Sequence, residues 1–415
     1  MKKSLFFIIA LSISTLFVSC DKNDDSGNFP KSISTELNVC GVKDLTLFTI
    51  DDYNFDEMVD WSMKNNAQTA GACSEIRTGN YVVRNLDWFQ YDQATYIVAV
   101  KRNKNHKASL SVCGMNDNVK HHFNNTKLTA KEANHLLAYT LDGMNEAGVY
   151  AGVNVVPFGQ MTTTNSNGVV NYKPTEGENK DKEPLSTSYL LRLILDNADN
   201  LTDAERLIKE TPWSDSDVMN KAGFQVHWLI CTEEGSFVCE FIDSKPTITY
   251  SNSTTSPDYG NVMTNFSNYL MNNGGNVQSH GAGYERWNTL ARNYNADPKD
   301  LARMVFYSRM YSTDYNDPNY FWSEWATDEY PAQLLIEWRD NPQSRTGEKW
   351  ENWVAYYNEC KAKYDWRTQG WDNDHSRGSW FTGHSSIWDL KNKSLVLDIE
   401  EQDKFAAKIN FDGTF

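Results

Sequence analysis

The sequence predicts an α+β fold in which antiparallel strands build the core and helices lie between them. Stretches rich in β-branched and aromatic residues, separated by turn residues, recur from residue 44 to 157 and from residue 224 to 266. Two segments between these regions, 186–198 and 200–210, are typical of helices, and Thr202 and Glu205 have the spacing of a capping box. Hydrophobic residues make up 40% of the 415 residues, enough for a sizeable core. These features together indicate a layered α+β architecture.

The first 35 residues have the pattern of an exported lipoprotein. Lysines 2 and 3 precede an apolar run, Leu5 to Val18, that is too short to span a bilayer comfortably. The run ends in "LFVSC", which resembles a bacterial lipoprotein cleavage site with Cys20 as the lipidated residue. We therefore expect a lipoprotein signal peptide over 1–19 and an acidic tether over 20–35. The alternative is an ordinary secreted protein in which Cys20 has no such role.

The signal predicts an exported bacterial lipoprotein, located in the periplasm or at the outer membrane or cell surface. Its contact with a membrane would be made only through the lipid on Cys20, because no other segment is long and apolar enough to cross a bilayer. The net charge of −16 argues against nucleic acid as a partner, since phosphates require clustered Lys and Arg.

The chain then divides into a short folded segment, 36–72, and a long domain, 73–415. The short segment contains a strand over 44–50 and a helix over 54–64. In the long domain, strand pairs are predicted around the turn Thr78-Gly79-Asn80 and over 94–115, 139–157, 224–243 and 384–400.

An insertion at about 310–380 is rich in tryptophan. These aromatic side chains either line an amphipathic cleft or serve as packing anchors of an inserted helical segment.

The motifs of several site classes are missing from the sequence. There is no H-E-x-x-H or C-x-x-C pair for a metal, no Walker loop for a nucleotide, and no G-x-S-x-G elbow for a serine nucleophile. We therefore expect neither a metal nor an organic cofactor.

Seven cysteines are present, and the sequence leaves their pairing open. Without Cys20, six could form three disulfides in an oxidising compartment. If Cys73 is also set aside, at least one of the remaining five is unpaired. Cys231 and Cys239 flank the turn 232–237, where they either face each other or are small buried hydrophobes.

Cys73 is the strongest candidate for a nucleophile, and it follows two small residues, Gly71 and Ala72. A cysteine hydrolase needs a base, yet no histidine lies beside Cys73 in the sequence. If Cys73 were the first residue of the mature chain, its own α-amine could be that base. A free α-amine has a pKa of about 7.7–8.0, so roughly a tenth or more is neutral at pH 7. This chemistry requires a cut between Ala72 and Cys73.

The stretch "CSEIRTGNYVVRNLDW" that starts at Cys73 resembles the mature start of the linear amide C–N hydrolases. This family of N-terminal-nucleophile enzymes includes choloylglycine hydrolases, penicillin V acylases, acid ceramidase and N-acylethanolamine acid amidase. The similarity continues in order through most of 73–415, in the stretches "DGMNEAGVYAGVNVVP", "HWLICTEEGSFVCEF", "VMTNFSNY", "YERW" and "HSSIWDLKNKSLVLDI". The resemblance implies the four-layer αββα sandwich of N-terminal-nucleophile hydrolases.

The resemblance also assigns a role to each matching residue. Cys73 corresponds to the nucleophile, Asp87 to the residue that binds its amine, and Arg84 to a cation beside the sulfur that favours the thiolate. Asn154 and Asn265 match the positions of oxyanion donors, and Arg286 matches a late arginine that braces the site. Taken alone, Asp87 and Arg84 are more typical of a structural ion pair, Asn154 and Asn265 of polar turn or edge residues, and Arg286 of a helix-surface charge.

The 72 residues before Cys73 are more than choloylglycine hydrolases and penicillin acylases usually lose. This length resembles the acid ceramidase and N-acylethanolamine acid amidase branch, whose zymogens cut themselves and keep the prosegment as a light chain. By that resemblance, segment 36–72 would be a light chain beside the 343-residue heavy chain (415 − 72). Cys40 and Cys360 are one candidate bridge between the two.

The sequence thus predicts an autoprocessed cysteine amidase that hydrolyses small amphipathic N-acyl amides: fatty acyl ethanolamides, amino acids or taurines. Conjugated bile salts and penicillin V are alternative substrates. An alternative of another class is a non-catalytic surface lipoprotein that binds a ligand through its Trp-rich segment. A homo-oligomer is compatible with the sequence, which contains no signal that decides oligomeric state.

Overall fold

The structure is a computed structural model of the whole chain. The residues it describes are 32–36, 45–50, 53–65, 72–88, 94–115, 130–157, 161, 169–215, 224–274, 283–298, 301, 329–330, 334–335, 337–338, 341–364, 381–399 and 405–410.

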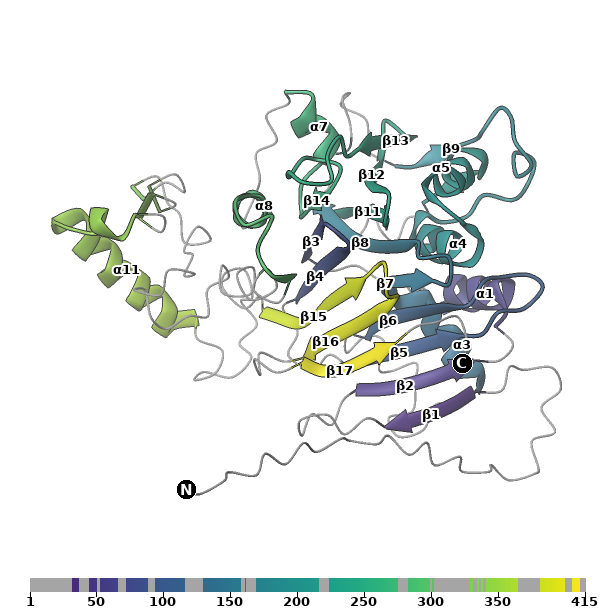
Figure 1. Cartoon of the computed structure of the whole chain (residues 1–415). Coiled ribbons are helices and arrows are strands. Elements are labelled where there is room, and N and C mark those ends of the chain that lie inside the picture. Colours follow the sequence, from purple (N-terminus) through teal and green to yellow (C-terminus); the bar gives the residue numbers. More distant parts are fainter. Residues whose placement is uncertain are drawn as a thin grey trace, which may run out of the picture.

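Two large β-sheets dominate the described part of the chain (Figure 1). The first has nine strands in the order β1-β2-β5-β6-β7-β8-β11-β12-β13, and the second has six in the order β14-β3-β4-β15-β16-β17. All neighbouring strands within them are antiparallel except β2 and β5, which are parallel. The strands of the nine-stranded sheet are β1 (Ser32–Glu36), β2 (Leu45–Ile50), β5 (Ala94–Val100), β6 (Ser109–Met115), β7 (Thr140–Asn145), β8 (Tyr150–Pro157), β11 (Phe224–Thr232), β12 (Gly235–Ile242) and β13 (Lys245–Tyr250). Those of the six-stranded sheet are β14 (Val262–Met263), β3 (Ala72–Thr78), β4 (Tyr81–Trp88), β15 (Phe381–Asp389), β16 (Ser394–Ile399) and β17 (Phe405–Asn410). A separate two-stranded sheet pairs β9 (Asn171–Tyr172) with β10 (Trp213–Ser214).

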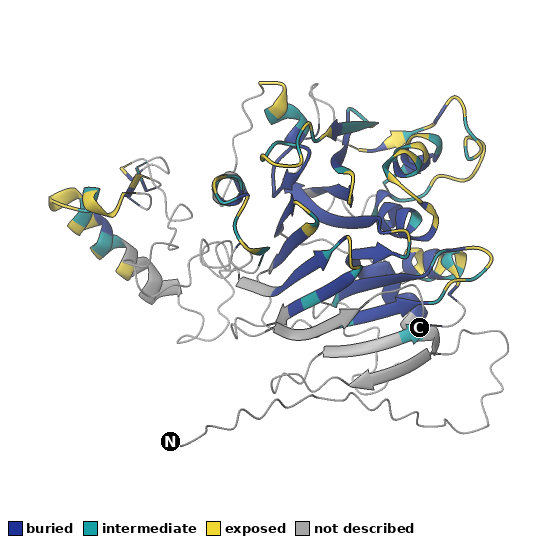
Figure 2. Cartoon of the chain, in the orientation of Figure 1, coloured by how far each residue is buried: buried dark blue, intermediate teal, exposed yellow. Residues whose placement is uncertain are grey.

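The two large sheets stack face to face, because alternate residues of their strands form one shared core. Val82 and Trp388 of the six-stranded sheet pack with Leu110, Met144 and Leu229 of the nine-stranded sheet. Successive side chains of a strand point to opposite faces, so the intervening residues face outward. Figure 2 shows the consequence, with most described residues of the central strands of both sheets buried.

Helices cover both outer faces. Their bounds are α1 (Phe55–Asn65), α3 (Ala130–Leu136), α4 (Leu190–Asn197), α5 (Leu201–Glu210), α7 (Asn268–Asn272), α8 (Gly283–Arg292) and α11 (Glu348–Tyr364), with short 3₁₀ turns at Leu137–Tyr139, Thr187–Tyr189 and Pro342–Ser344. On the nine-stranded sheet, Ile194 and Leu195 of α4 pack against Val153 of β8. On the six-stranded sheet, Leu290 of α8 packs against Ile76 of β3. The order helix, sheet, sheet, helix is the αββα sandwich that the sequence predicts, and the fold class is confirmed.

The segment before Cys73 is built into this sandwich. Strand β2 pairs with β5, and helix α1 places Met58 and Val59 in a core shared with Val98 and Leu137. Residues 32–35, which the sequence places in the acidic tether, pair with β2 as part of β1, so that interpretation is corrected. The signal peptide and Cys20 lie outside the described residues.

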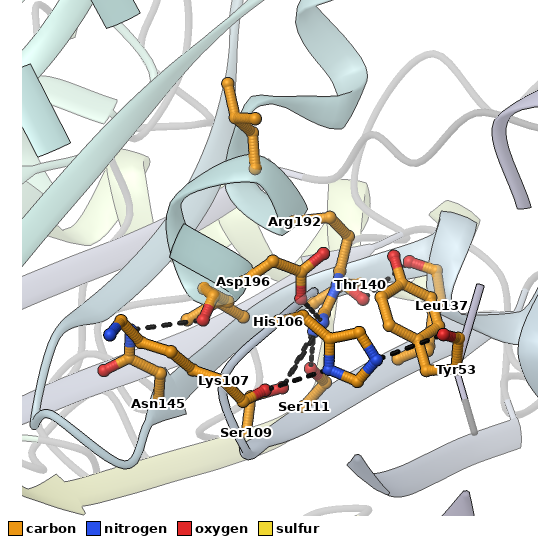
Figure 3. A network of polar contacts seen from close by, with 12 residues as sticks. Tyr53, His106, Lys107, Ser109, Ser111, Leu137, Thr140, Asn145, Arg192 and Asp196 are labelled. Carbon is orange, nitrogen blue, oxygen red and sulfur yellow. Dashed lines mark hydrogen bonds and ion pairs between the residues drawn. The ribbon is translucent and has the colours of Figure 1, made fainter. Parts of the chain in front are cut away.

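A buried polar network ties this segment to the rest of the chain (Figure 3). His106 Nε2 lies 3.1 Å from the carbonyl oxygen of Tyr53, and the Arg192 guanidinium lies 5.0 Å from the centre of the Tyr53 ring. Arg192 pairs with Asp196 one helical turn away and donates to Ser111 Oγ at 2.9 Å. The network therefore joins a residue before Cys73 to residues far beyond it.

The predicted hairpins around residue 79, over 94–115 and over 224–243 are confirmed, as is the closing one. The predicted capping box is wrong. Asn200, two residues before Thr202, accepts a hydrogen bond from Asp203 N at 2.9 Å and caps α5, while Glu205 pairs with Lys209 instead. An Asn with extended backbone directly before the first helical turn is already a strong cap.

The cysteines Cys231 and Cys239 do not face each other. Cys231 lies opposite Ser236, and Cys239 lies opposite Trp228, which places the two side chains in cores on opposite faces of the sheet. Both are free and buried, as are Cys73 and Cys113. The pair Cys40 and Cys360 lies outside the described residues, apart from the backbone of Cys360 in α11.

In the insertion, Trp338 and Trp353 are buried with Tyr330 and Leu335 in a small core of their own. For these tryptophans the packing alternative is confirmed. Of the helices that can be described, none is long and apolar enough to span a membrane.

The core that α1 contributes can be tested with two methionines of the same helix. Met58 is fully buried, whereas Met63 is 59% exposed. We expect Met58→Ala to lower the free energy of unfolding by about 2–5 kcal/mol, because it leaves a cavity under β5. Met63→Ala should change it by less than about 0.5 kcal/mol. Urea denaturation of both variants measures the difference, and equal effects would contradict the placement of α1.

Candidate active site

The hairpin of β3 and β4 sets the geometry around Cys73. Its turn contains Gly79, whose φ of 53° lies in the left-handed region that favours glycine. The resulting register places Leu86 opposite Cys73 and Arg84 opposite Glu75. Because directly opposite residues share a face, all four side chains point toward the nine-stranded sheet.

The Arg84 guanidinium donates hydrogen bonds through two of its nitrogens and faces a carboxyl group with the third, Nη1, which makes no hydrogen bond to the described residues. Nη2 donates to Cys73 Sγ at 3.0 Å and to the carbonyl oxygen of Val153 at 3.1 Å. Nε donates to Glu75 Oε1 at 3.0 Å, and Nη1 lies 3.5 Å from Asp142 Oδ1. A cation in contact with the sulfur favours the thiolate form of a cysteine.

These charges are fully buried, and burial acts on each of them. It raises the pKa of Glu75 to about 8, although Arg84 and a hydrogen bond from Tyr150 oppose the change. Burial also raises the pKa of Asp142, against the lowering effect of Arg84. The pKa of Arg84 is raised despite its own burial, because the Cys73 thiol group and the carboxyl groups of Asp142 and Glu75 favour its charged form. The guanidinium therefore stays charged beside the sulfur.

Asp142 is held from the opposite sheet. Its Oδ2 accepts hydrogen bonds from Ser386 Oγ and from Trp388 Nε1, both at 2.6 Å. These two residues lie on β15, opposite Arg84 and Val82 of β4. The ion pair between Asp142 and Arg84 thus crosses the interface between the sheets.

The backbone of Cys73 is held by Asn265 and Arg286. The Cys73 N–H donates to Asn265 Oδ1 at 3.2 Å, and Asn265 Nδ2 donates to the carbonyl oxygen of Val155 at 2.7 Å. Arg286, on α8, donates to the carbonyl oxygen of Cys73 at 2.7 Å and to Ser74 Oγ at 2.6 Å, and also to Asn265 Oδ1. The backbone N–H and the carbonyl oxygen of the candidate nucleophile are thereby both hydrogen-bonded to side chains.

Asn154, on β8, is buried next to this cluster. One end of its amide lies 2.8 Å from Glu75 Oε1 and 2.9 Å from the Val153 carbonyl oxygen. The other end lies 3.4 Å from the carbonyl oxygen of Met263 and 3.5 Å from that of Thr264. The shorter contacts are hydrogen bonds when the amide nitrogen faces Glu75, and this orientation satisfies the amide best.

The structure therefore brings together the predicted residues Cys73, Arg84, Asn154, Asn265 and Arg286. The backbone of Asp87 lies opposite Ala72 across the hairpin, so it is adjacent to the expected cut. The side chains of Asp87 and Ala72 lie outside the described residues.

Three residues of the site were missed by sequence reasoning: Glu75, Asp142 and His384. Glu75 could have been found, because it stands two positions after Cys73, on the same face of a strand that is otherwise suited to burial. His384 lies opposite Leu86, in the same row as Cys73. Burial and the nearby charge of Arg84 hold the pKa of His384 well below its usual range, so the imidazole is neutral at pH 7.

In the part of the chain that is described, no group of three or more His, Cys, Asp and Glu side chains is arranged to hold a metal ion.

The αββα sandwich and a buried cysteine backed by an arginine on the adjacent strand define a hydrolase of the N-terminal-nucleophile class. The family model of linear amide C–N hydrolases, choloylglycine hydrolase family, matches residues 73–295, which is more than half of the chain. The chain belongs to this family and is a hydrolase that acts on linear amide C–N bonds.

Among solved structures, the chain is similar to two variants of conjugated bile acid hydrolase from Clostridium perfringens. Both are 16% identical; the TM-scores are 0.41 and 0.39, and the matches cover 83% and 81% of this chain and 93% and 92% of the other. It is also similar to penicillin V acylase from Agrobacterium tumefaciens, at 14% identity and a TM-score of 0.34, covering 79% of this chain and 82% of that one. No curated protein matches the sequence.

The close packing above Glu75 gives a test of this geometry. A Cβ added at Gly152 would overlap the Glu75 carboxyl group, with 2.8 Å to its Cδ, and would also overlap the Tyr150 hydroxyl. We expect Gly152→Ala to lower the free energy of unfolding by about 1–3 kcal/mol through overpacking.

Gly235→Ala on β12 is the matched control, because the nearest atom is the end of the Leu201 side chain at 3.3 Å, which can move aside. Chemical denaturation of the two variants compares how far each substitution lowers the free energy of unfolding. A Gly152→Ala protein as stable as Gly235→Ala would be inconsistent with this packing.

Proposed function

We propose that the chain is an autoprocessed cysteine amidase that hydrolyses N-acyl conjugates through a thioester on Cys73. The observation that carries this proposal is the 3.0 Å contact between Arg84 Nη2 and Cys73 Sγ, at the first residue of the family match. Cys73 would lie at the end of a new chain after a cut before it, and its α-amine would then be the base.

The first step of the proposed mechanism is self-cleavage. The Cys73 thiolate attacks the carbonyl carbon of Ala72, the peptide C–N bond breaks, and the acyl group moves to the sulfur while the nitrogen takes up a proton. Water then hydrolyses this thioester and releases the Ala72 carboxylate. Asn265 and Arg286 support the step: Asn265 already accepts from the N–H of the peptide to be cut, and Arg286 fixes the Cys73 carbonyl oxygen on the other side of the nucleophile.

Turnover would repeat this chemistry on a substrate. The thiolate attacks the amide carbonyl, Asn154 and Asn265 donate to the oxyanion, and the α-ammonium protonates the leaving amine. Water activated by the same amine hydrolyses the thioester. In this scheme Asp87 binds the amine, a role consistent with its position opposite Ala72.

The prosegment would stay bound after the cut. Its strand β2 and helix α1 belong to the same core as β5 and α3, and its Trp61 ring stacks on His135 at 4.5 Å. Burial of apolar surface of this kind favours continued association of the segment with the rest of the fold. A lipid on Cys20 would then anchor the light chain and, through it, the enzyme at the periplasmic or outer face of a bacterial membrane.

For substrates we propose fatty acyl ethanolamides, amino acids and taurines. Conjugated bile salts are the second candidate, because the family takes its name from choloylglycine. Penicillin V is the third compound class.

Intact mass spectrometry of exported protein tests the cut. We expect the wild type to give a heavy chain that begins at Cys73 together with a co-purifying light chain, whereas Cys73→Ala should remain a single chain. Cys113→Ala is the matched control, because Cys113 is also free and buried but has no part in the proposed chemistry. A wild-type chain that is intact before Cys73 would overturn the proposed autoprocessing.

Amine release from a panel of fatty acyl and bile acyl conjugates of ethanolamine, glycine and taurine, with penicillin V beside them, tests the activity. We expect release by the wild type, and a loss of at least about 10³-fold in kcat/KM in Cys73→Ser, since the nucleophile is the centre of the mechanism. Absence of release from every compound, in a correctly processed protein, would favour the binding alternative.

A further inference from the structure

Glu75 contacts both halves of the proposed catalytic machinery. Its Oε1 accepts from Arg84 Nε at 3.0 Å, and Arg84 in turn contacts the Cys73 sulfur. The same oxygen lies 2.8 Å from the amide of Asn154, the proposed oxyanion donor. Glu75 is fully buried, and nothing in the mechanism described above uses it.

The surrounding strands are shaped to admit this carboxyl group. Tyr150 Oη donates to Glu75 Oε2 at 3.2 Å. Two residues further along β8, Gly152 provides the space in which the carboxyl lies, since a Cβ there would overlap it. Asn154 follows after two more residues. The three successive inward positions of β8 therefore all border Glu75.

We propose that Glu75 is a positioning residue of this enzyme, which holds the Arg84 guanidinium on one side and the Asn154 amide on the other, so that the nucleophile and the oxyanion donor keep a fixed geometry. This assignment rests on the proposed cysteine amidase function. Glu75 acts through Arg84 and Asn154 and does not itself touch the reacting atoms.

The protonation state of Glu75 determines how strongly the Arg84 charge stabilises the Cys73 thiolate. Arg84 already faces the carboxyl group of Asp142 at 3.5 Å. A neutral Glu75 still accepts the Arg84 hydrogen bond and leaves more of the guanidinium charge for the sulfur. An ionised Glu75 adds a second negative charge beside the thiolate, which disfavours that thiolate by like-charge repulsion.

Every element packed around Glu75 contributes to its titration. Burial raises its pKa to about 8, so the carboxyl is largely protonated at pH 7 and ionises as the pH rises above 8. The titratable and charged groups that face it are Cys73 on its own strand, Arg84 on β4, Asp142 on β7, Tyr150 on β8 and Cys231 on β11.

The test compares Glu75→Gln with Glu75→Ala in the full-length, processed protein. Gln keeps the acceptor for Arg84 and cannot ionise, whereas Ala removes all contacts. At pH 7 we expect kcat/KM of Glu75→Ala to fall by as much as about 10²-fold, as for other losses of catalytic geometry, and that of Glu75→Gln to stay within severalfold of the wild type.

The pH dependence separates positioning from a structural role. We expect wild-type kcat/KM to fall above about pH 8 as Glu75 ionises, and this alkaline fall to be absent in Glu75→Gln. Asp196→Asn is the matched control, because Asp196 is also a buried acid paired with an arginine but lies in the network around Tyr53. Asp196→Asn should lower the free energy of unfolding without changing the pH at which kcat/KM falls on the alkaline side.

Alkylation of Cys73 by iodoacetamide, followed by peptide mass spectrometry, gives a readout that needs no substrate. The buried Cys113 serves as internal reference for opening of the fold. Below about pH 7 we expect Glu75→Gln and the wild type to react at the same rate. Above pH 8 Glu75→Gln should react up to roughly tenfold faster, which corresponds to a Cys73 thiol pKa lower by about one unit than in the wild type.

Identical alkylation profiles in the two proteins, or a Glu75→Gln enzyme that keeps the alkaline fall, would overturn the role of Glu75. Failure of the proposed function has a different signature: no cut before Cys73 and no amine release by the wild type, whatever the alkylation rates are.

Discussion

The buried guanidinium of Arg84 is the feature on which the site and the sandwich both depend. A buried charge is tolerated only when its partners replace the water it has lost. Here the partners come from β3, β7 and β8, so the cation joins the two sheets as well as contacting the sulfur. Asp142 continues the connection to β15 through Ser386 and Trp388. A charge that must be held from two sheets explains why the candidate nucleophile lies in the interior of the fold, between layers of apolar side chains.

Much of this arrangement follows from local sequence rules. The turn at Gly79 and Asn80 fixes the register of its hairpin, and that register alone places Arg84 opposite Glu75, two residues from Cys73. The strand pattern likewise predicts the faces of β3 and β4. The partners of Arg84 on the other sheet could not be predicted in this way. Asp142 and Ser386 are 244 residues apart in the chain, and their contact depends on how the two sheets stack, which no local pattern encodes.

Two details that the sequence did not decide have the same origin. Cys231 and Cys239 are the right distance apart in the sequence to face each other only if the turn between them is centred at residue 235. The actual turn pairs Thr232 with Gly235, which moves the register and puts the two thiols on opposite faces of the sheet. Resemblance placed Asn265 correctly next to Cys73, yet its oxygen accepts the Cys73 N–H in the uncut chain. Whether an amide donates or accepts is decided by its neighbours, and a sequence motif does not specify them.

The geometry of the uncut chain bears on the order of events. Asn265, the proposed oxyanion donor, already accepts the hydrogen bond of the Cys73 N–H, and Arg286 already holds the Cys73 carbonyl oxygen. The residues before Cys73 supply a strand and a helix to the core, so the sandwich includes them when it folds. In the proposed scheme Arg84 and Asn265 are in place around Cys73 before the cut, the cut adds the α-amine that serves as base, and the light chain would then remain as part of the fold that positions Arg84. In this view self-cleavage is the first turnover of the enzyme, with its own prosegment as the acyl group.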